Sequence, residues 1–222
     1  MPTLESNRAH WAENGSYEWP DAGEEWSIPW GGTDNLWRTM LEPRLSGILP
    51  VDVCVEIACG YGRITTYLAP RCRRLIAVDI GENCVAACCE RFAMSPHVEV
   101  YLNDGYTLPT VADRSVDLVF SFDSLVHVDE QVMRSYLREI RRVLRRGGRA
   151  VLHHSNLAAQ RRALWYSRRL GRCGRDTTVS GALVTEWARA ADLSVDSVEP
   201  ITWPTISRRV PSDCITSLTA ES

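Results

Sequence analysis

The sequence predicts an α/β fold in which a seven-stranded, mostly parallel sheet is covered by helices on both faces. Two observations support this prediction. From residue 50 onward, short apolar runs alternate with helical patterns, as is typical of parallel strands joined by helices. The chain also has 222 residues, a length that fits one α/β domain better than two small ones. We therefore expect a single active site.

The first three strands are expected at residues 52–58, 74–79 and 98–102, where the apolar runs are short. A glycine turn at residues 60–62 leads from the first strand into a helix that continues to residue 68. A second helix is expected at about 82–92, between the second and third strands. Strands and helices thus alternate as this fold class requires.

The other four strands are expected at residues 116–120, 149–153, 195–198 and 214–218. A long helix at about 130–145 follows the first of these, and the pair Gly147-Gly148 is expected to end it. Ser180 is suited to cap a further helix that reaches about Ala191. The stretch 171–174, which contains two glycines, is expected to be a mobile loop.

The first 48 residues differ from the rest of the chain. Five of the eight tryptophans lie there among acids and glycines, outside any periodic apolar pattern: Trp11, Trp19, Trp26, Trp30 and Trp37. Such a segment is expected to pack over another part of the molecule instead of folding alone. We therefore divide a single structural domain into an N-terminal lid at 1–48 and a main body at 49–222.

The composition indicates a cytoplasmic protein and narrows the possible chemistry. No apolar run approaches the roughly 18 residues of a membrane span, and the N-terminus has neither a basic head nor an apolar core. The eight cysteines include no C-x-x-C pair, so we expect buried small side chains instead of metal ligands or disulfides. All 25 basic residues are arginine, which excludes catalysis by a lysine amine.

Thirteen arginines lie between Arg134 and Arg175, with Glu139 as the only acid among them. A nucleic-acid-binding face is one interpretation of this charge. The other is a solvated amphipathic helix, because the apolar residues at 136, 137, 140, 143 and 144 form one stripe and arginines occupy the remaining positions. We favour the amphipathic helix, since the chain as a whole has a net charge of −3.

The turn at residues 60–62 lets backbone approach a ligand closely and leaves the N–H groups of the next helix to bind it. Dinucleotide-binding loops carry a third glycine where this chain has Thr65. The strand before the turn also carries the acid Glu56 near its end. An acidic strand end suits a cationic ligand with hydroxyl and amine groups better than it suits a pyrophosphate.

In these features the chain resembles the class I S-adenosylmethionine-dependent methyltransferases, which have a Rossmann-like fold. Their first motif, acid-x-x-x-Gly-x-Gly, is matched by Glu56, Gly60 and Gly62. The run 75–79 resembles their second strand, whose final acid holds the ribose hydroxyls, and a carboxylate can accept two hydrogen bonds from a diol. Segments 103–105, 116–123 and 137–148 resemble later motifs, so the resemblance covers roughly residues 50–155.

The flanking segments resemble a bacterial subgroup of this superfamily through the runs 30–32, 121–127 and 154–156. The resemblance implies S-adenosylmethionine as the cofactor and the following residues as its contacts: Trp30, Gly31, Trp37, Glu56, Ala58, Gly60, Gly62, Arg63, Asp79, Ile80, Asn103, Asp104, Gly105, Phe122 and Asp123. Among them, Asp79 is expected on the ribose and Asp104 on the adenine amino group. By their charge, Arg38 and Arg63 are the two candidates for the methionine carboxylate.

Chemistry is expected at the carboxyl ends of the fourth and fifth strands, where open α/β sheets bind ligands. Methyl transfer requires that acceptor and methyl be held in line and that a protonated acceptor lose one proton. Asp123 and His127 are candidates for this base or for a clamp on the methionine amine, and Asn156 for a substrate contact. A purely structural His127 is the alternative. His153 and His154 point to opposite faces of their strand, so they cannot both enter the site.

Tryptophan faces attract a sulfonium through cation–π interaction. We expect Trp30 and Trp37 to supply such faces from the lid, whereas Trp11, Trp187 and Trp203 are expected to serve in packing.

The leading functional hypothesis is a methyltransferase that acts on a small molecule or secondary metabolite, held between the N-terminal segment and the loops around 156–180. The alternative is a cyclase of the same fold, in which the cofactor's amine attacks its own γ-carbon to give azetidine-2-carboxylate and methylthioadenosine. An RNA methyltransferase and a non-catalytic binding module are less favoured. We expect no metal and no membrane partner, and the oligomeric state stays open.

Overall fold

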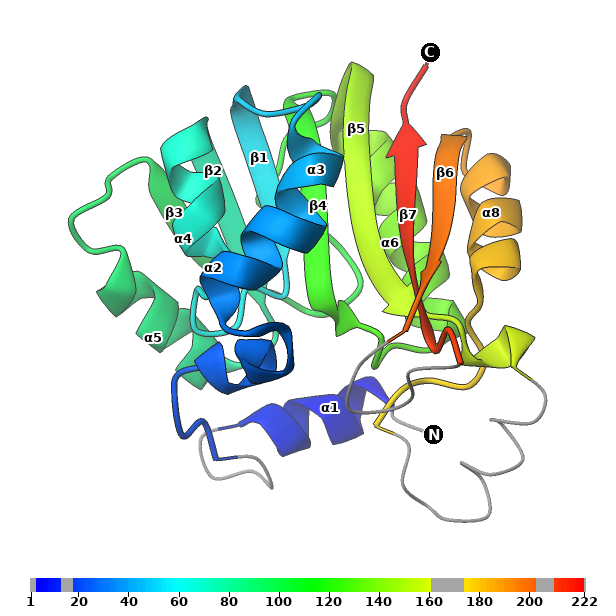
Figure 1. Ribbon diagram of the computed structural model, residues 1–222. Coiled ribbons are helices and arrows are strands. Elements are labelled where there is room, and N and C mark those ends of the chain that lie inside the picture. Colours follow the sequence, from blue (N-terminus) through cyan, green and yellow to red (C-terminus); the bar gives the residue numbers. More distant parts are fainter. Residues whose placement is uncertain (1–2, 13–17, 161–173, 203–209, 222) are drawn as a thin grey trace.

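The computed structural model describes residues 3–12, 18–160, 174–202 and 210–221. Its strands form one seven-stranded sheet in the order β3-β2-β1-β4-β5-β7-β6 (Figure 1). β7 runs antiparallel to both of its neighbours, and the other neighbouring pairs are parallel. The prediction of a seven-stranded, mostly parallel sheet is therefore confirmed, with one antiparallel edge.

All seven strands lie where the apolar runs predict them. Their bounds are Val51–Ile57 (β1), Cys72–Asp79 (β2), Val98–Leu102 (β3), Val116–Leu125 (β4), Leu144–Ser155 (β5), Ser194–Ile201 (β6) and Asp213–Thr219 (β7). β4 continues five residues past its expected end, and this extension carries polar side chains to the edge of the sheet. The polar residues Ser121, Asp123 and Ser124 interrupt the apolar run there, which is why the extension is absent from the prediction.

The helical segments connect these strands and also build the N-terminal region. The α-helices are Leu4–Trp11 (α1), Thr33–Leu36 (α2), Glu42–Leu45 (α3), Thr65–Leu68 (α4), Glu82–Arg91 (α5), Glu130–Val143 (α6) and Gly181–Ala190 (α8). Glu24–Trp30 (η1), Ala69–Arg71 (η3) and Leu157–Ala159 (η4) are 3₁₀ turns, and Trp37–Leu41 (η2) is a π-helical turn that links α2 to α3. The Ser180 hydroxyl accepts a hydrogen bond from the Leu183 N–H, which confirms Ser180 as the N-cap of α8.

The expected end of α6 is wrong. The helix stops at Val143, and Leu144 is already extended and begins β5. Gly147 adopts a φ of +74° within β5 and donates its N–H to the Ala220 carbonyl at 2.7 Å. The glycine pair thus does not terminate a helix. It lies in an irregular part of β5, where the pairing register between β4 and β5 shifts.

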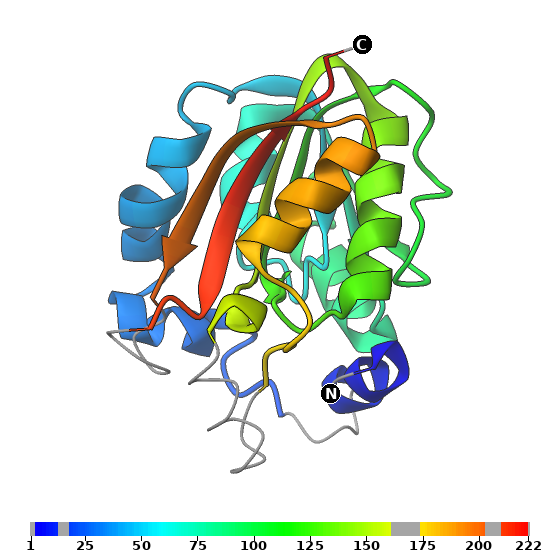
Figure 2. The same ribbon diagram turned by 90° about the vertical axis from the view of Figure 1, so that its right-hand side faces the viewer.

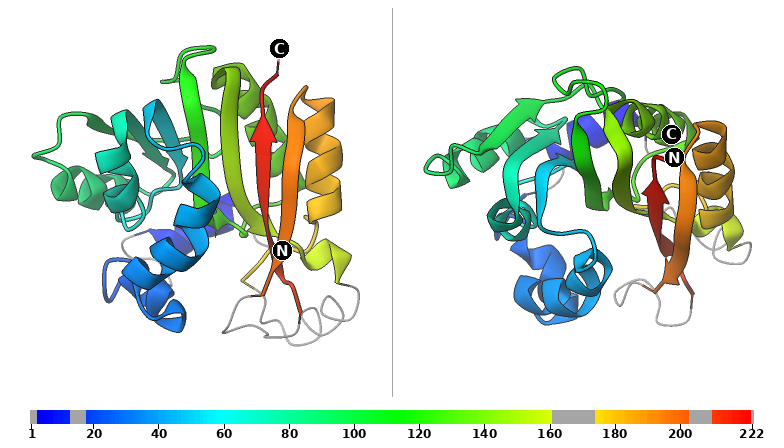
Figure 3. Two further views of the ribbon diagram at one scale, coloured as in Figure 1. Left: turned by 45° about the horizontal axis from the view of Figure 1, so that its top comes forward. Right: turned by 90° about the horizontal axis from the view of Figure 1, so that it is seen from above.

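Helices lie on both faces of the sheet (Figures 2 and 3). A hydrophobic core fills the space between the helices and the sheet on each face. On one face, α2, η2, α3 and α4 pack against alternate residues such as Leu75 and Leu118, and α5 packs beside them over β2 and β3. On the other face, apolar residues of α6 and α8 share one core with Ile76 and Val119 of the sheet. Helices therefore cover both faces, because both faces of these strands are apolar. The buried stripe of α6 also confirms it as an amphipathic helix.

The N-terminal helix α1 crosses the carboxyl edge of the sheet, at the bottom of Figure 1. Thr3 and Ser6 cap this helix reciprocally. Two side-chain bonds tie it to the edge: the Asn7 amide donates to the His127 carbonyl at 2.8 Å, and the Asn83 amide donates to the Trp11 carbonyl at 3.0 Å. The helix α1 thus lies over the edge where parallel strands end.

The structure can also be compared with the expectations for the cysteines, for a membrane span, for two tryptophans and for the loop at 171–174. Five of the seven cysteines in the described ranges are buried, whereas Cys72 is half-buried and Cys89 is exposed. None of the helices in those ranges has the length and apolar character needed to cross a membrane. Trp187 packs in the core beneath α8, as expected. Trp203, Cys173 and most of the loop at 171–174 lie outside the described residues.

Candidate functional site

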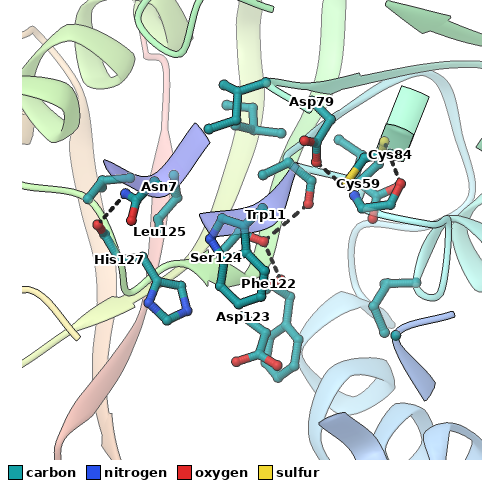
Figure 4. A pocket seen from close by; sticks show the side chains of 18 of the residues that line it. Asn7, Trp11, Cys59, Asp79, Cys84, Phe122, Asp123, Ser124, Leu125 and His127 are labelled. Carbon is teal, nitrogen blue, oxygen red and sulfur yellow. Dashed lines mark hydrogen bonds between the residues drawn. The ribbon is translucent and has the colours of Figure 1, made fainter. Parts of the chain in front are cut away.

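A pocket opens at the carboxyl edge of the sheet, between the ends of β1, β2 and β4 (Figure 4). The loop after β1 forms one wall, the segment 122–128 forms another, and the N-terminal region closes the outside. Many residues of the expected cofactor set line it: Glu56, Ala58, Gly60, Arg63, Asp79, Ile80, Gly105, Phe122 and Asp123. The candidate base His127 lines it as well. Open α/β sheets commonly bind ligands at this edge.

The loop after β1 turns sharply because several of its residues have left-handed backbone. Ala58, Gly60 and Gly62 have φ values of +60°, +55° and +82°. A side chain at Gly62 would also collide with Phe92, whose ring lies 2.7 Å from the position of a Cβ. Gly62 itself does not line the pocket, so its role here is to let α5 pack against the loop.

Asp79 holds this loop in place from the end of β2. One carboxylate oxygen accepts the Gly60 N–H at 2.9 Å, and the other accepts the Gly81 N–H at 2.9 Å. Burial raises the pKa of Asp79 above its usual value, although these backbone hydrogen bonds oppose the shift. The carboxylate therefore both organises the loop and faces the pocket.

Glu56 lies at the base of the pocket, near the end of β1. Its side chain is only 3% exposed, and it accepts a hydrogen bond from the Thr65 hydroxyl at 2.6 Å. Burial raises the pKa of Glu56 to about 7, despite the opposing effects of Thr65 and the charge of Arg63. Near neutral pH this carboxyl group can accept or release a proton in response to a ligand.

Arg63 and Asp123 form an ion pair inside the pocket. The Nη2 atom of Arg63 lies 3.2 Å from Oδ2 of Asp123, and its Nη1 donates to the Ser27 hydroxyl at 2.6 Å. Burial raises the pKa of Asp123, and the charge of Arg63 opposes that shift. A cation and an anion thus stand side by side next to the glycine loop.

His127 stands across the pocket from the loop, and its ring points into the space beside Trp11 (Figure 4). Its Nδ1 is hydrogen-bonded to the Gly174 carbonyl, so Nδ1 carries the proton and Nε2 has a lone pair. Loss of solvation and the charge of Arg175 lower the pKa of His127 to about 4. The imidazole is therefore neutral at physiological pH.

The tryptophans in the pocket are not those that sequence reasoning favoured. Trp11, Trp19 and Trp26 line it, whereas Trp30 and Trp37 do not. The centroid of Trp11 lies 5.8 Å from that of Trp19 and 6.0 Å from that of Trp26. Trp11, expected to serve only in packing, therefore contributes to the pocket wall.

Trp30 and Trp37 instead pack against the core formed by α2, η2 and α3. Trp37 is 4% exposed and stacks on Tyr67, with ring centroids 5.1 Å apart and the Arg71 guanidinium on its face. Gly31, between them in the chain, ends η1 with a φ of +82°. These positions support the N-terminal region from behind the pocket wall.

The loop after β3 uses its polar side chains internally. Asn103 accepts hydrogen bonds from the Gly105 N–H and the Tyr136 hydroxyl and donates to the Thr107 carbonyl. The Asp104 carboxylate accepts from the Tyr106 N–H and from both the N–H and the hydroxyl of Thr107. Among the three expected contacts at 103–105, only Gly105 lines the pocket, where Leu4 of α1 lies against it.

Asn156 also lies outside the pocket lining. Its amide oxygen accepts the Gly181 N–H at 3.0 Å, and its amide nitrogen donates to the Pro211 carbonyl at 3.1 Å. The side chain therefore joins the end of β5 to the start of α8 and to the chain before β7.

The two adjacent histidines of β5 face opposite sides of the sheet, as expected. His154 is fully buried, and its Nε2 is 2.8 Å from the Thr216 hydroxyl on β7. The ring of His153 stacks on Phe122 at 4.7 Å, and its Nδ1 accepts the Asp123 N–H at 3.0 Å. His153 is thus the one directed to the site, although it stands behind Asp123 and not in the lining.

Sequence reasoning did not single out several other lining residues: Leu4, Asn7, Cys59, Tyr61, Cys84, Ser124, Tyr136 and Arg175. Tyr61 and Cys59 flank Gly60, so their place in the motif was the available signal. No sequence signal distinguished Arg175 from the other arginines among the 25 in the chain, because only the tertiary structure brings it to the pocket.

Residues 55–152 match the family model for a methyltransferase domain. The matched stretch runs from β1 into β5 and contains the glycine loop, Asp79 and Asp123. No curated protein sequence matches the chain. The arrangement of acids and glycines described above thus coincides with a recognised methyltransferase segment.

Solved methyltransferase structures share the fold over most of their length. The N-methyltransferase NodS from Bradyrhizobium japonicum WM9, in complex with S-adenosyl-L-homocysteine, is 18% identical, with 97% of this chain and 96% of that chain covered and a TM-score of 0.66. The geranyl diphosphate C-methyltransferase from Streptomyces coelicolor A3(2), in complex with Mg²⁺, geranyl diphosphate and S-adenosyl-L-homocysteine, is 16% identical, with coverages of 90% and 87% and a TM-score of 0.68.

A chain from the complex between the Haloferax volcanii Trm112 methyltransferase activator and a methyltransferase is 19% identical, with coverages of 90% and 97% and a TM-score of 0.64. At these identities the likeness establishes the fold alone. The chain therefore has the Rossmann-like fold of S-adenosylmethionine-dependent methyltransferases.

Proposed function

We propose that the chain is an S-adenosylmethionine-dependent methyltransferase that acts on a small-molecule acceptor. The methyltransferase-domain match and the neighbours bound to S-adenosyl-L-homocysteine indicate S-adenosylmethionine as the cofactor. The single observation that most supports the proposal is the Arg63–Asp123 ion pair in the pocket. It stands beside the glycine loop and complements the opposite charges of an α-amino acid.

The pocket residues fit the parts of this cofactor. The Arg63 guanidinium would hold the methionine carboxylate and the Asp123 carboxylate its ammonium group. Asp79 would accept from the ribose hydroxyls while it keeps its bonds to the loop. Ile80 and Gly105 also line the pocket and would offer surface for the adenine ring.

Glu56 adds negative charge beneath the loop once it is ionised. A cationic ligand favours the ionised form of a nearby carboxyl group, so binding of S-adenosylmethionine should lower the pKa of Glu56 from about 7. Binding should then release a proton near neutral pH.

When bound, the cofactor supplies an electrophilic methyl group on a sulfonium. The chain's own part is to orient the acceptor and accept its proton. His127 is suited to the second task, because its Nε2 is unprotonated and Nδ1 is fixed on the Gly174 carbonyl. Trp11, Trp19 and Trp26 would exclude water and offer ring faces to the cation.

The N-terminal segment, residues 1–48, would act as the lid over this pocket. α1 covers the edge, Trp19 stacks on Tyr61 of the loop, and Ser27 binds Arg63. A covered pocket admits small acceptors more readily than the side chain of a folded macromolecule. This enclosure is our reason for placing the acceptor among small molecules.

The expected residues that do not line the pocket would act from behind its wall. Asn103 fixes the Gly105 backbone, and Asp104 holds the loop that follows. Trp30, Gly31 and Trp37 support the N-terminal region, and Asn156 holds the end of β5. We assign these residues to positioning and not to direct contact.

The proposal is tested by titrating the purified chain with S-adenosylmethionine and S-adenosyl-L-homocysteine by calorimetry. The expected result is micromolar binding of both, with loss of binding in Arg63→Met. Incubation with S-adenosylmethionine alone should yield no methylthioadenosine. Absence of binding would overturn the proposal, and rapid release of methylthioadenosine would establish the cyclase reaction in its place.

A further inference from the structure

Asp123, near the end of β4, has an unusual left-handed backbone conformation. Its φ is +63°, in the left-handed region, which costs a residue other than glycine on the order of 1 kcal/mol. The β4–β5 ladder skips at this point, since Ser121 pairs with Leu152 and the next pair is Leu125 with His154. The Asp123 N–H thus lies where regular strand pairing is interrupted.

The His153 side chain accepts a hydrogen bond from this N–H, which has no partner in the strand ladder. Its Nδ1 accepts the bond at 3.0 Å, and its ring is stacked on Phe122, the residue before Asp123. An Nδ1 that accepts a hydrogen bond cannot carry a proton, so the ring carries its proton on Nε2. His153 is 1% exposed, and its orientation is therefore set by these partners.

The Nε2 atom of His153 faces Asp213 at the start of β7, 3.4 Å from Oδ2. Asp213 is in turn held by Arg175 through two bonds, Nε to Oδ1 at 2.6 Å and Nη2 to Oδ2 at 2.8 Å. Burial alone would raise the pKa of Asp213, but His153 and Arg175 outweigh it and lower that pKa to about 2. An ionised carboxylate next to Nε2 stabilises the tautomer that leaves Nδ1 free to accept.

We infer that His153 is a positioning residue for the cofactor's amino-acid moiety: it holds the Asp123 backbone in the left-handed conformation that directs the carboxylate into the pocket beside Arg63. Asp213 and Arg175 act through His153 by selecting its tautomer. The inference rests on the proposed function, because it assigns Asp123 to the ammonium group of S-adenosylmethionine.

A matched pair of variants separates the two ring nitrogens. In His153→Asn the amide oxygen can occupy the place of Nδ1, whereas in His153→Gln the longer side chain reaches the place of Nε2 and leaves no acceptor near the Asp123 N–H. The probes are S-adenosylmethionine and methylthioadenosine, which lacks the amino-acid moiety. Asp123→Asn serves as the reference for loss of the carboxylate.

We expect His153→Asn to bind S-adenosylmethionine within about threefold of the wild type, and His153→Gln and Asp123→Asn to bind it about tenfold more weakly. Methylthioadenosine should bind all three variants and the wild type alike. If His153 served only the general stability of the fold, His153→Gln would lose affinity for both ligands together, and the inference would be overturned. Unchanged affinity of His153→Gln for S-adenosylmethionine would equally overturn it. A wild type that binds neither ligand would instead overturn the proposed function.

A second measurement does not depend on the folding of any variant. The ¹⁵N resonances of His153 in the wild-type chain should report a protonated Nε2 and an unprotonated Nδ1. A proton on Nδ1 would remove the bond to Asp123 and overturn the inference.

Discussion

The Trp19 indole lies flat on the Tyr61 ring, with centroids 4.4 Å apart and an angle of 11° between the planes. One residue belongs to the N-terminal segment and the other to the glycine loop. Stacked aromatic pairs stabilise by about 0.5–1.5 kcal/mol beyond the area they bury. We therefore expect Trp19→Ala to weaken S-adenosylmethionine binding by about 3- to 10-fold, with faster dissociation measured by stopped-flow fluorescence. Tyr61→Phe keeps the ring and should bind normally. Equal dissociation rates in Trp19→Ala and the wild type would argue against a lid.

Glu56 should make stability depend on pH. Its folded pKa of about 7 lies above the ordinary value of 4.5, so its contribution to folding is present below about pH 4.5 and lost as the pH rises through 7. The full loss amounts to about 3 kcal/mol. Relative to the wild type, Glu56→Gln should gain up to that amount between pH 5 and pH 8 in urea unfolding, while its affinity for S-adenosylmethionine falls. Parallel stability curves for the two proteins would contradict this prediction.

Asp79 should be needed both for the loop and for the ligand. Asp79→Ala leaves the N–H groups of Gly60 and Gly81 without their acceptor, so we expect a loss of roughly 1–3 kcal/mol in unfolding free energy. Calorimetry should show S-adenosylmethionine binding weakened more than tenfold. Within the described residues, the Asp104 carboxylate forms hydrogen bonds only inside its own loop. Asp104→Ala should therefore have the smaller effect on affinity. The reverse order would restore a direct adenine contact for Asp104.

His127 should stay neutral over the physiological range. Its pKa of about 4 lies below the ordinary 6.5, so its contribution to stability is present above pH 6.5 and is lost as the pH falls through 4. Histidine NMR signals, with His127→Gln used for assignment, should show no titration of His127 between pH 5 and 8 and a proton on Nδ1. A titration midpoint of His127 near pH 6.5 would contradict the prediction that this imidazole is neutral throughout the physiological range.

Gly105 should be intolerant of a side chain. A Cβ there would lie 2.5 Å from the Leu4 Cδ1 atom, and its φ of +87° is strained for any other residue. Gly105→Ala should therefore displace α1, which limited proteolysis within residues 1–12 can detect. Adding Leu4→Ala removes the collision and should restore part of the protection. Protection equal to the wild type in Gly105→Ala alone would show that α1 does not depend on this contact.

The sheet could be predicted from the sequence because its strands are buried on both faces and read as continuous apolar runs. The motif residues Glu56, Asp79 and Arg63 could be placed because they adjoin strand ends. The end of α6 could not, since Gly147-Gly148 resembles a helix stop and only pairing with β4 and β7 shows it to be part of a strand.

The outer wall of the pocket was beyond prediction for a different reason. Trp11, Trp19 and Trp26 have no periodicity that distinguishes them from Trp30 and Trp37, and their positions depend on how the N-terminal segment docks on the finished sheet. The link from Arg175 to Asp213 and His153 likewise joins three elements that are distant in sequence. Such contacts are set by tertiary structure and leave no local pattern.

The position of β7 has a consequence for synthesis of the chain. β5 and β6 are joined only through β7, which pairs with residues about 65 positions earlier in the chain. Until residue 219 leaves the ribosome, β5 therefore presents an open row of backbone donors and acceptors, a template for pairing with other chains. A nascent chain that stalls before β7 is exposed to aggregation at this edge, and the buried Asp213 joins His153 only as the last strand closes the sheet.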